Sequence, residues 1–177
     1  MAEEKRPPWN SLEIAKLCCD LATPLIIAVI GFVITHQLEE QKRLQETVSA
    51  GRNKIYEEVK HGLFHIFCYI EEIHTWKEDN PDKISEYRHS VNEAMWAEPN
   101  YWRLDTFQAF KDYMDAAFQT FAGTATDALI KTNSGQKPLL PNWKPEWEKR
   151  LTGSPHDPNH RAKYKKFQDL MYRDLVE

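Results

Sequence analysis

An uninterrupted run of uncharged, largely apolar residues near the N-terminus constrains the fold of this 177-residue chain more than any other feature. The run covers residues 21–38, LATPLIIAVIGFVITHQL, and contains no Asp, Glu, Lys or Arg. As an α-helix it would be about 27 Å long, close to the thickness of the hydrocarbon core of a bilayer. We therefore expect a transmembrane helix over residues 17–38. A buried core helix is the alternative, because the densest apolar part, residues 25–34, is shorter.

This interpretation divides the chain into an N-terminal tail (residues 1–16), the transmembrane helix (17–38) and a cytoplasmic domain (39–177). The basic residues that flank the run are Lys5, Arg6 and Lys16 before it, and Lys42, Arg43, Arg52 and Lys54 after it. A slight excess of positive charge on the C-terminal side favours placing the larger domain in the cytoplasm. The three cysteines show no pairing pattern, which agrees with a reducing compartment.

Small and polar residues follow one face of the expected transmembrane helix. They recur at spacings of three or four, and they are Asp20, Pro24, Ala28, Gly31 and Thr35. Bulky Ile26, Val29 and Val33 lie opposite. A stripe of small residues lets helices approach closely in lipid, and an acidic residue on it should face other helices or water. Two interpretations remain: a solitary anchor with Asp20 among the headgroups, or an oligomer with this face between copies or around a pore.

Helical periodicity continues beyond the membrane segment. The apolar residues at helical spacing are Leu44, Val48, Ile55, Val59, Leu63, Ile66 and Ile70. They predict one long helix over residues 38–76, or two helices broken near Gly51. A turn at residues 78–81 precedes a second helix over 82–97, which should bury Ile84, Tyr87, Val91 and Met95.

An aromatic stripe predicts the most regular helix, over residues 104–121. Its members are Phe107, Phe110, Met114, Phe118 and Phe121, and Gly123 should end it. A short helix is expected over residues 127–131, then a long loop over 133–145 that is held to the domain by Trp143 and Trp147. The last helix should begin near Pro158 and bury Tyr164, Phe167, Leu170, Met171 and Leu175. No strand pattern or phosphate-binding loop is evident, so the predicted fold class is all-α.

Two sets of residues have spacings that are also found in functional sites. His61 and His65 lie one helical turn apart and could share a metal, but the segment lacks the Glu of H-E-x-x-H, so we expect no metal site and no cofactor. Arg150 and His156 are separated by five residues, which fits the R-x(4–6)-H pattern of all-helical HEPN ribonucleases. The match is degenerate, because Leu151 follows the Arg where the family usually has a polar residue, and Gly and Pro interrupt the segment. The net charge of −4 argues against stable nucleic-acid binding.

Taken together, these features resemble the small accessory membrane protein that accompanies the RNA-guided ribonuclease of type VI-B CRISPR systems. The resemblance covers the whole chain: its length, the single LATPLIIAVIGFVIT membrane run, the all-helical remainder and the degenerate Arg150–His156 motif. It implies a homo-oligomeric ring, an octamer among the expected sizes, in the bacterial inner membrane. The N-terminal helices would surround a pore, and HEPN-like helical bundles would form a cytoplasmic vestibule.

The resemblance further implies an accessory effector that strengthens antiphage defence by permeabilising or depolarising the membrane. Its functional partner would be the RNA-guided ribonuclease, with or without direct contact. Arg150 and His156 would then be structural or regulatory, and the protein would not be an enzyme. An uncharged wall of Ile27, Ile30 and Ile34 could serve as a hydrophobic gate. The alternatives are a membrane-tethered HEPN ribonuclease and a non-catalytic membrane-anchored adaptor.

Overall fold

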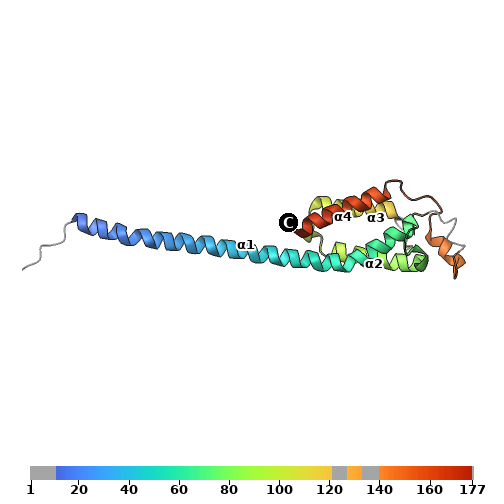
Figure 1. Cartoon of the computed structure of the whole chain (residues 1–177), viewed down its shortest axis with the longest axis horizontal. Helices are drawn as coiled ribbons and strands as arrows, with labels where there is room; N and C mark the ends of the chain where they lie inside the picture. The colour runs from blue at the N-terminus through green and yellow to red at the C-terminus, as the bar shows by residue number, and fades with distance from the viewer. Residues whose placement is uncertain (1–10, 121–126, 133–139, 177) are drawn as a thin grey trace, which may run out of the picture. The chain divides into compact units, whose positions relative to one another are not determined.

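The computed structural model describes residues 11–120, 127–132 and 140–176, without the side chains of residues 11–23 and Leu25. Over these residues the chain is mainly α-helical, which confirms the predicted class (Figure 1). Its contacts divide it into two units, Met1–Thr47 and Val48–Glu177. The first described unit consists of the beginning of helix α1, and the second contains the hydrophobic core.

Helix α1 (Ser11–Glu71) includes all of residues 17–38 and passes through Gly51 without a break. The periodicity of residues 38–76 was compatible with one helix or with two, and the structure contains one. It ends five residues before the expected position because Glu72 adopts a left-handed conformation, with φ 56°, and the Ile73 N–H donates to the carbonyl of Cys68 at 3.1 Å. This hydrogen bond satisfies one of the carbonyl groups of the last turn. Trp76 instead begins a short 3₁₀-helix, η1 (Trp76–Glu78).

Helix α2 (Pro81–Ala97) begins at the predicted turn. The Asn80 side chain accepts a hydrogen bond from the Lys83 N–H at 2.9 Å, and a proline at the first helical position needs no N–H partner. The inward residues are Ile84, Val91 and Met95, whereas Tyr87 is only partly buried. A Cβ built on Gly62 of α1 would lie 2.8 Å from Val91 Cγ2, so the absence of a side chain at residue 62 permits this close approach.

Helices α3 (Leu104–Ala117) and α4 (His160–Val176) pack along each other (Figure 1). The 3₁₀-helix η2 (Pro99–Tyr101) precedes α3. The predicted aromatic stripe is buried at Phe110, Met114 and Phe118, although the helix ends at Ala117. Phe121 and Gly123 lie outside the described residues. Within α4 the buried members of the predicted set are Tyr164, Phe167 and Met171, and Leu170 and Leu175 pack at the edge of the core.

The short helix expected over residues 127–131 is wrong. Leu129–Ile130 forms strand β2, which pairs antiparallel with β1 (Phe118–Gln119), and Phe118 lies opposite Ile130. The pairing leaves Ile130 fully buried and is extended by a hydrogen bond of 3.0 Å from the Thr152 N–H to the Ile130 carbonyl. Strands of two residues are too short to show a period-two pattern, so they could not be predicted from periodicity.

The segment before α4 is held to the domain as expected. The 3₁₀-helix η4 (Pro145–Arg150) carries Trp147, whose indole N–H donates to Asp82 of α2 at 2.7 Å. Trp143 packs edge-on against Trp147 with the ring centroids 5.5 Å apart. Residues 133–139 of the predicted loop lie outside the described part of the chain.

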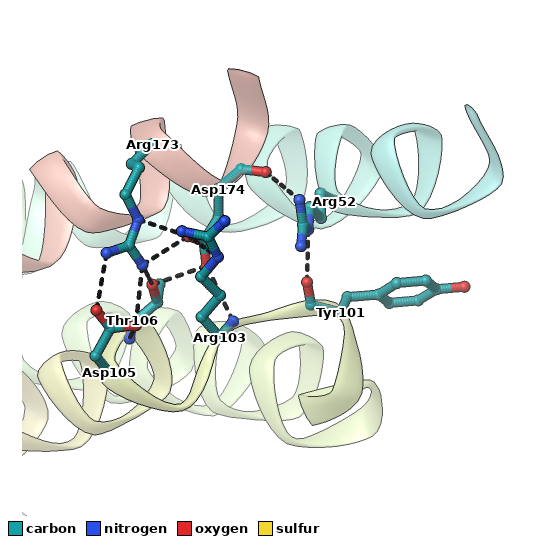
Figure 2. A network of polar contacts seen from close by, with 7 residues as sticks. All are labelled: Arg52, Tyr101, Arg103, Asp105, Thr106, Arg173 and Asp174. Carbon is teal, nitrogen blue, oxygen red and sulfur yellow. Dashed lines mark hydrogen bonds and ion pairs between the residues drawn. The ribbon is translucent and has the colours of Figure 1, made fainter. Parts of the chain in front are cut away.

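A polar network fastens the start of α3 to the end of α4 (Figure 2). Asp174 is fully buried and accepts hydrogen bonds from the Arg103 N–H at 3.0 Å and from the Thr106 hydroxyl at 2.8 Å. Arg173 bonds the same carboxylate at 2.8 Å and binds Asp105 through two nitrogens at 2.8 and 2.9 Å. Burial raises the pKa of Asp174, but these hydrogen bonds outweigh burial and hold it below its usual value.

Candidate functional site

The part of α1 from residue 24 to residue 38, here named the apolar segment, exposes most of its side chains. The exposed fractions of its large apolar residues are Ile26 57%, Ile27 64%, Val29 59%, Ile30 52%, Phe32 70%, Val33 46%, Ile34 51% and Leu38 60%. At 100° per residue these positions surround most of the helix circumference. Exposed apolar surface of this extent marks a site of contact with another protein or with lipid.

The predicted small-residue face lies within the apolar segment, except for Asp20, whose side chain is outside the described part. Pro24, Ala28, Gly31 and Thr35 are all exposed. A Cβ built on Gly31 meets nothing within 4 Å, so the chain itself does not require a glycine there. Thr35 Oγ donates to the Gly31 carbonyl at 2.8 Å, which satisfies its hydroxyl within the helix.

The expected gate residues, Ile27, Ile30 and Ile34, are also exposed in the single chain. Charged residues begin directly after the apolar segment, with Glu39, Glu40 and Lys42. His36, within the segment, lies with its Nδ1 3.6 Å from Glu40 Oε1. Across the part of the chain that the structure describes, no helix has a stretch long and apolar enough to cross a membrane.

Arg150, the first residue of the pattern that resembles the HEPN motif, lies at the end of η4 and is bound by two carboxylates. Its Nη1 is 2.8 Å from Asp127 Oδ2, and its Nε is 3.1 Å from Asp82 Oδ1. Asp127 also receives Arg88 Nη1 at 3.2 Å and His89 Nε2 at 3.3 Å. The Arg150 guanidinium therefore joins η4 to α2 and to the segment before β2.

His156, the second residue of the motif, faces a different carboxylate. Its Nε2 is 3.7 Å from Glu71 Oε1, at the last residue of α1. The same Glu71 bonds His160 Nδ1 at 2.9 Å and Arg161 Nη2 at 2.9 Å. Burial raises the pKa of Glu71, but the hydrogen bonds from His160 and Arg161 outweigh it and lower the pKa below its usual value. The structure thus gives Arg150 and His156 separate acidic partners.

His61 and His65 lie side by side on α1, with ring centroids 4.4 Å apart. His65 Nδ1 is already hydrogen-bonded to the buried Asp79 at 2.6 Å, and its ring stacks on Tyr87. Among the described residues, no group of three or more His, Cys, Asp or Glu side chains is arranged to hold a metal ion. The His65–Asp79 pair instead connects α1 to the turn between η1 and α2.

Sequence patterns did not reveal the acidic residues that organise these contacts. Glu71, Asp79, Asp127 and Asp174 are buried or partly buried, and their partners come from distant parts of the chain. The one sequence feature that could have indicated a buried carboxylate is an acidic residue beside an apolar position, such as Asp174 next to Leu175. Comparisons with protein-family models, with curated proteins and with solved structures gave no match.

Proposed function

We propose that the protein is anchored in the bacterial inner membrane by its N-terminal helix and assembles there with copies of itself into a pore. In this proposal it is an accessory effector of RNA-guided antiphage defence, which permeabilises or depolarises the membrane. The exposed apolar segment of α1 is the observation that carries the anchoring and the assembly. The role in defence and the link to an RNA-guided ribonuclease rest on the resemblance of the sequence alone.

The exposure of the apolar segment supports a lipid environment. Burying apolar surface stabilises by about 25 cal/mol per Å², so eight large apolar side chains left in water at about half exposure are unfavourable. Because they surround most of the helix, a single protein surface would cover only some of them. Acyl chains cover all sides of a helix. The internally bonded hydroxyl of Thr35 suits the same environment, since hydrocarbon supplies no hydrogen-bond partner.

The small-residue face supports assembly. Gly31 has open space beside it, so a second helix can approach its backbone closely. One helix cannot enclose a channel, and a pore therefore requires several copies. In such an assembly the exposed Ile27, Ile30 and Ile34 are available to narrow the channel as a ring of apolar side chains.

Gly31→Leu tests the proposal, with Val29→Leu on the opposite face as the matched control. Both changes keep the segment apolar, and the Cβ at residue 31 meets no atom of the chain, so neither disturbs the fold of the single molecule. We expect the wild-type protein in detergent to be a large homo-oligomer by light scattering and to release dye from liposomes. Gly31→Leu should reduce both the mass and the release, whereas Val29→Leu should leave both unchanged.

Three results would contradict the proposal in different ways. A wild-type protein that stays soluble and monomeric without lipid or detergent would refute the proposed membrane anchor. Oligomers that form but release no dye would refute the proposed pore. Equal behaviour of Gly31→Leu and Val29→Leu would remove the assignment of the packing face while leaving the anchor in place.

A further inference from the structure

Helices α2 and α3 border a surface cavity of about 170 Å³ in the Val48–Glu177 unit. Its apolar lining comes from α3 and the residue that follows it, and consists of Phe110, Met114 and Phe118. Its other side is formed by Arg88, Asn92 and Trp96, which are spaced four residues apart along α2. Neither the hydrophobic core nor the proposed pore requires such a cavity.

Trp96 offers a flat aromatic surface at this cavity. Its side chain is 54% exposed, which is unusual for the largest apolar side chain. Phe107 contacts it edge-to-face, with ring centroids 4.8 Å apart and an interplanar angle of 84°. The contact restrains the orientation of the indole and leaves much of it open, as in aromatic platforms on which planar ligands stack.

Two of the polar side chains that line the cavity have no partner among the described residues. The side chains of Lys111 and Asn92, both partly buried, form no hydrogen bond or ion pair with any described residue. Arg88, by contrast, is paired with Asp127 at 3.2 Å and lies over the ring of Phe118. The Asp115 side chain also lines the cavity, but it is exposed and Lys111 forms no ion pair with it. The partly buried Lys111 ammonium can therefore pair with an anionic group of a ligand, and the Asn92 amide can both donate and accept.

We propose that this cavity binds a small ligand that combines one flat ring system with an anionic group, as a mononucleotide or an aromatic carboxylate does. The ring lies against Trp96 and the apolar lining, the Asn92 amide meets its polar edge, and the Lys111 ammonium pairs with the anion. Pockets that enclose drug-sized ligands measure about 300–1,000 Å³. A smaller cavity admits one ring system and leaves the charged group at its mouth. This binding is independent of the proposed pore.

Titration calorimetry on the full-length protein in detergent tests the inference. AMP and benzoate carry both features, adenosine carries only the ring, and inorganic phosphate carries only the charge. We expect AMP or benzoate to bind with a Kd below about 1 mM, and adenosine and phosphate at least about fivefold more weakly. Binding of AMP alone identifies a nucleotide site, and binding of benzoate alone identifies a site for aromatic acids.

Two variants assign the binding to this cavity. Trp96→Ala should weaken binding about tenfold, within the range of ring stacking on an aromatic side chain. Lys111→Gln should weaken AMP or benzoate about fivefold and leave adenosine unchanged, because only the charged contact is lost. Lys165→Gln, an exposed lysine on α4, is the control and should change nothing. Absence of binding by both ring-bearing anions, phosphate binding as tight as AMP, or full binding by Trp96→Ala would each overturn the inference.

Discussion

Replacement of Asp174 by alanine should destabilise the helical domain more than any surface change. The carboxylate is fully buried and receives the Arg103 N–H, the Thr106 hydroxyl and the Arg173 guanidinium (Figure 2). Alanine would leave the fully buried Thr106 hydroxyl without this acceptor. It would also remove the negative charge that pairs with the neighbouring Arg173 guanidinium. The contact between the start of α3 and the end of α4 would lose its central group.

The magnitude follows from these contacts. Breaking a buried ion pair by removing one partner costs about 3–5 kcal/mol. Arg173 keeps its two bonds to Asp105 and is partly exposed, so the stranded cation is compensated in part. We therefore expect a loss near the lower end, about 3–4 kcal/mol. Asp174→Asn keeps an acceptor for Thr106 or Arg103 and should cost less, about 1–2 kcal/mol.

Urea unfolding of the full-length protein in detergent, followed by tryptophan fluorescence, measures this loss. With a slope of about 1–3 kcal/mol per M, Asp174→Ala should lower the unfolding midpoint by about 2 M. Asp169→Ala is the matched control on the same helix, because Asp169 and its partner Lys165 are both mostly exposed, and it should cost less than about 1 kcal/mol. Equal losses for the two variants would refute the reasoning, since burial would then have no effect on the strength of the carboxylate contacts.

Three other changes probe different parts of the domain. Gly62→Ala should lower its stability by about 1 kcal/mol in the same assay, because overpacking against the buried Val91 outweighs the better helix propensity of alanine; a stabilised variant would show that Val91 moves aside. Burial lowers the pKa of His160 despite its bond to an acidic residue. The contribution of His160 to the free energy of unfolding is therefore fully present above the unfolded pKa of about 6.5, and it is lost as the pH falls below that value. His160→Gln should therefore flatten the decline in unfolding free energy between about pH 7 and pH 5, and an unchanged decline would exclude His160 as its source. Arg150→Ala should cost about 1 kcal/mol through its lost bond to Asp127 and leave dye release intact, whereas loss of release at unchanged stability would argue for a functional guanidinium.

The helices of the domain were predictable because their apolar residues repeat at helical spacing. Val91, Phe110 and Phe167 were assigned to buried faces from this spacing alone, and all three are buried. Helix ends were less predictable. α1 ends at Glu71 because Glu72 adopts a left-handed backbone conformation. Glycine or asparagine usually takes this conformation at a helix end, so a glutamate does not predict it.

Contacts between distant residues could not be predicted from one sequence. The bond between Thr106 and Asp174 joins residues 68 positions apart, and nothing in either neighbourhood marks the other. Trp96 and Lys111 were equally unmarked, because exposure and the lack of a partner become visible only when α2 and α3 are in place. The apolar segment was the exception, since a local run of residue types defines it.

The position of Glu71 has a consequence for how the domain opens. A negative charge at the last residue of α1 is unfavourable for that helix, whose own dipole is negative at this end. The same charge lies against His160 and Arg161 in the first turn of α4, where a helix favours an anion. The carboxylate thus stabilises the helix that it does not belong to. Fraying at the tail of α1 and at the head of α4 should consequently occur together, as one cooperative local opening and not as two separate ones.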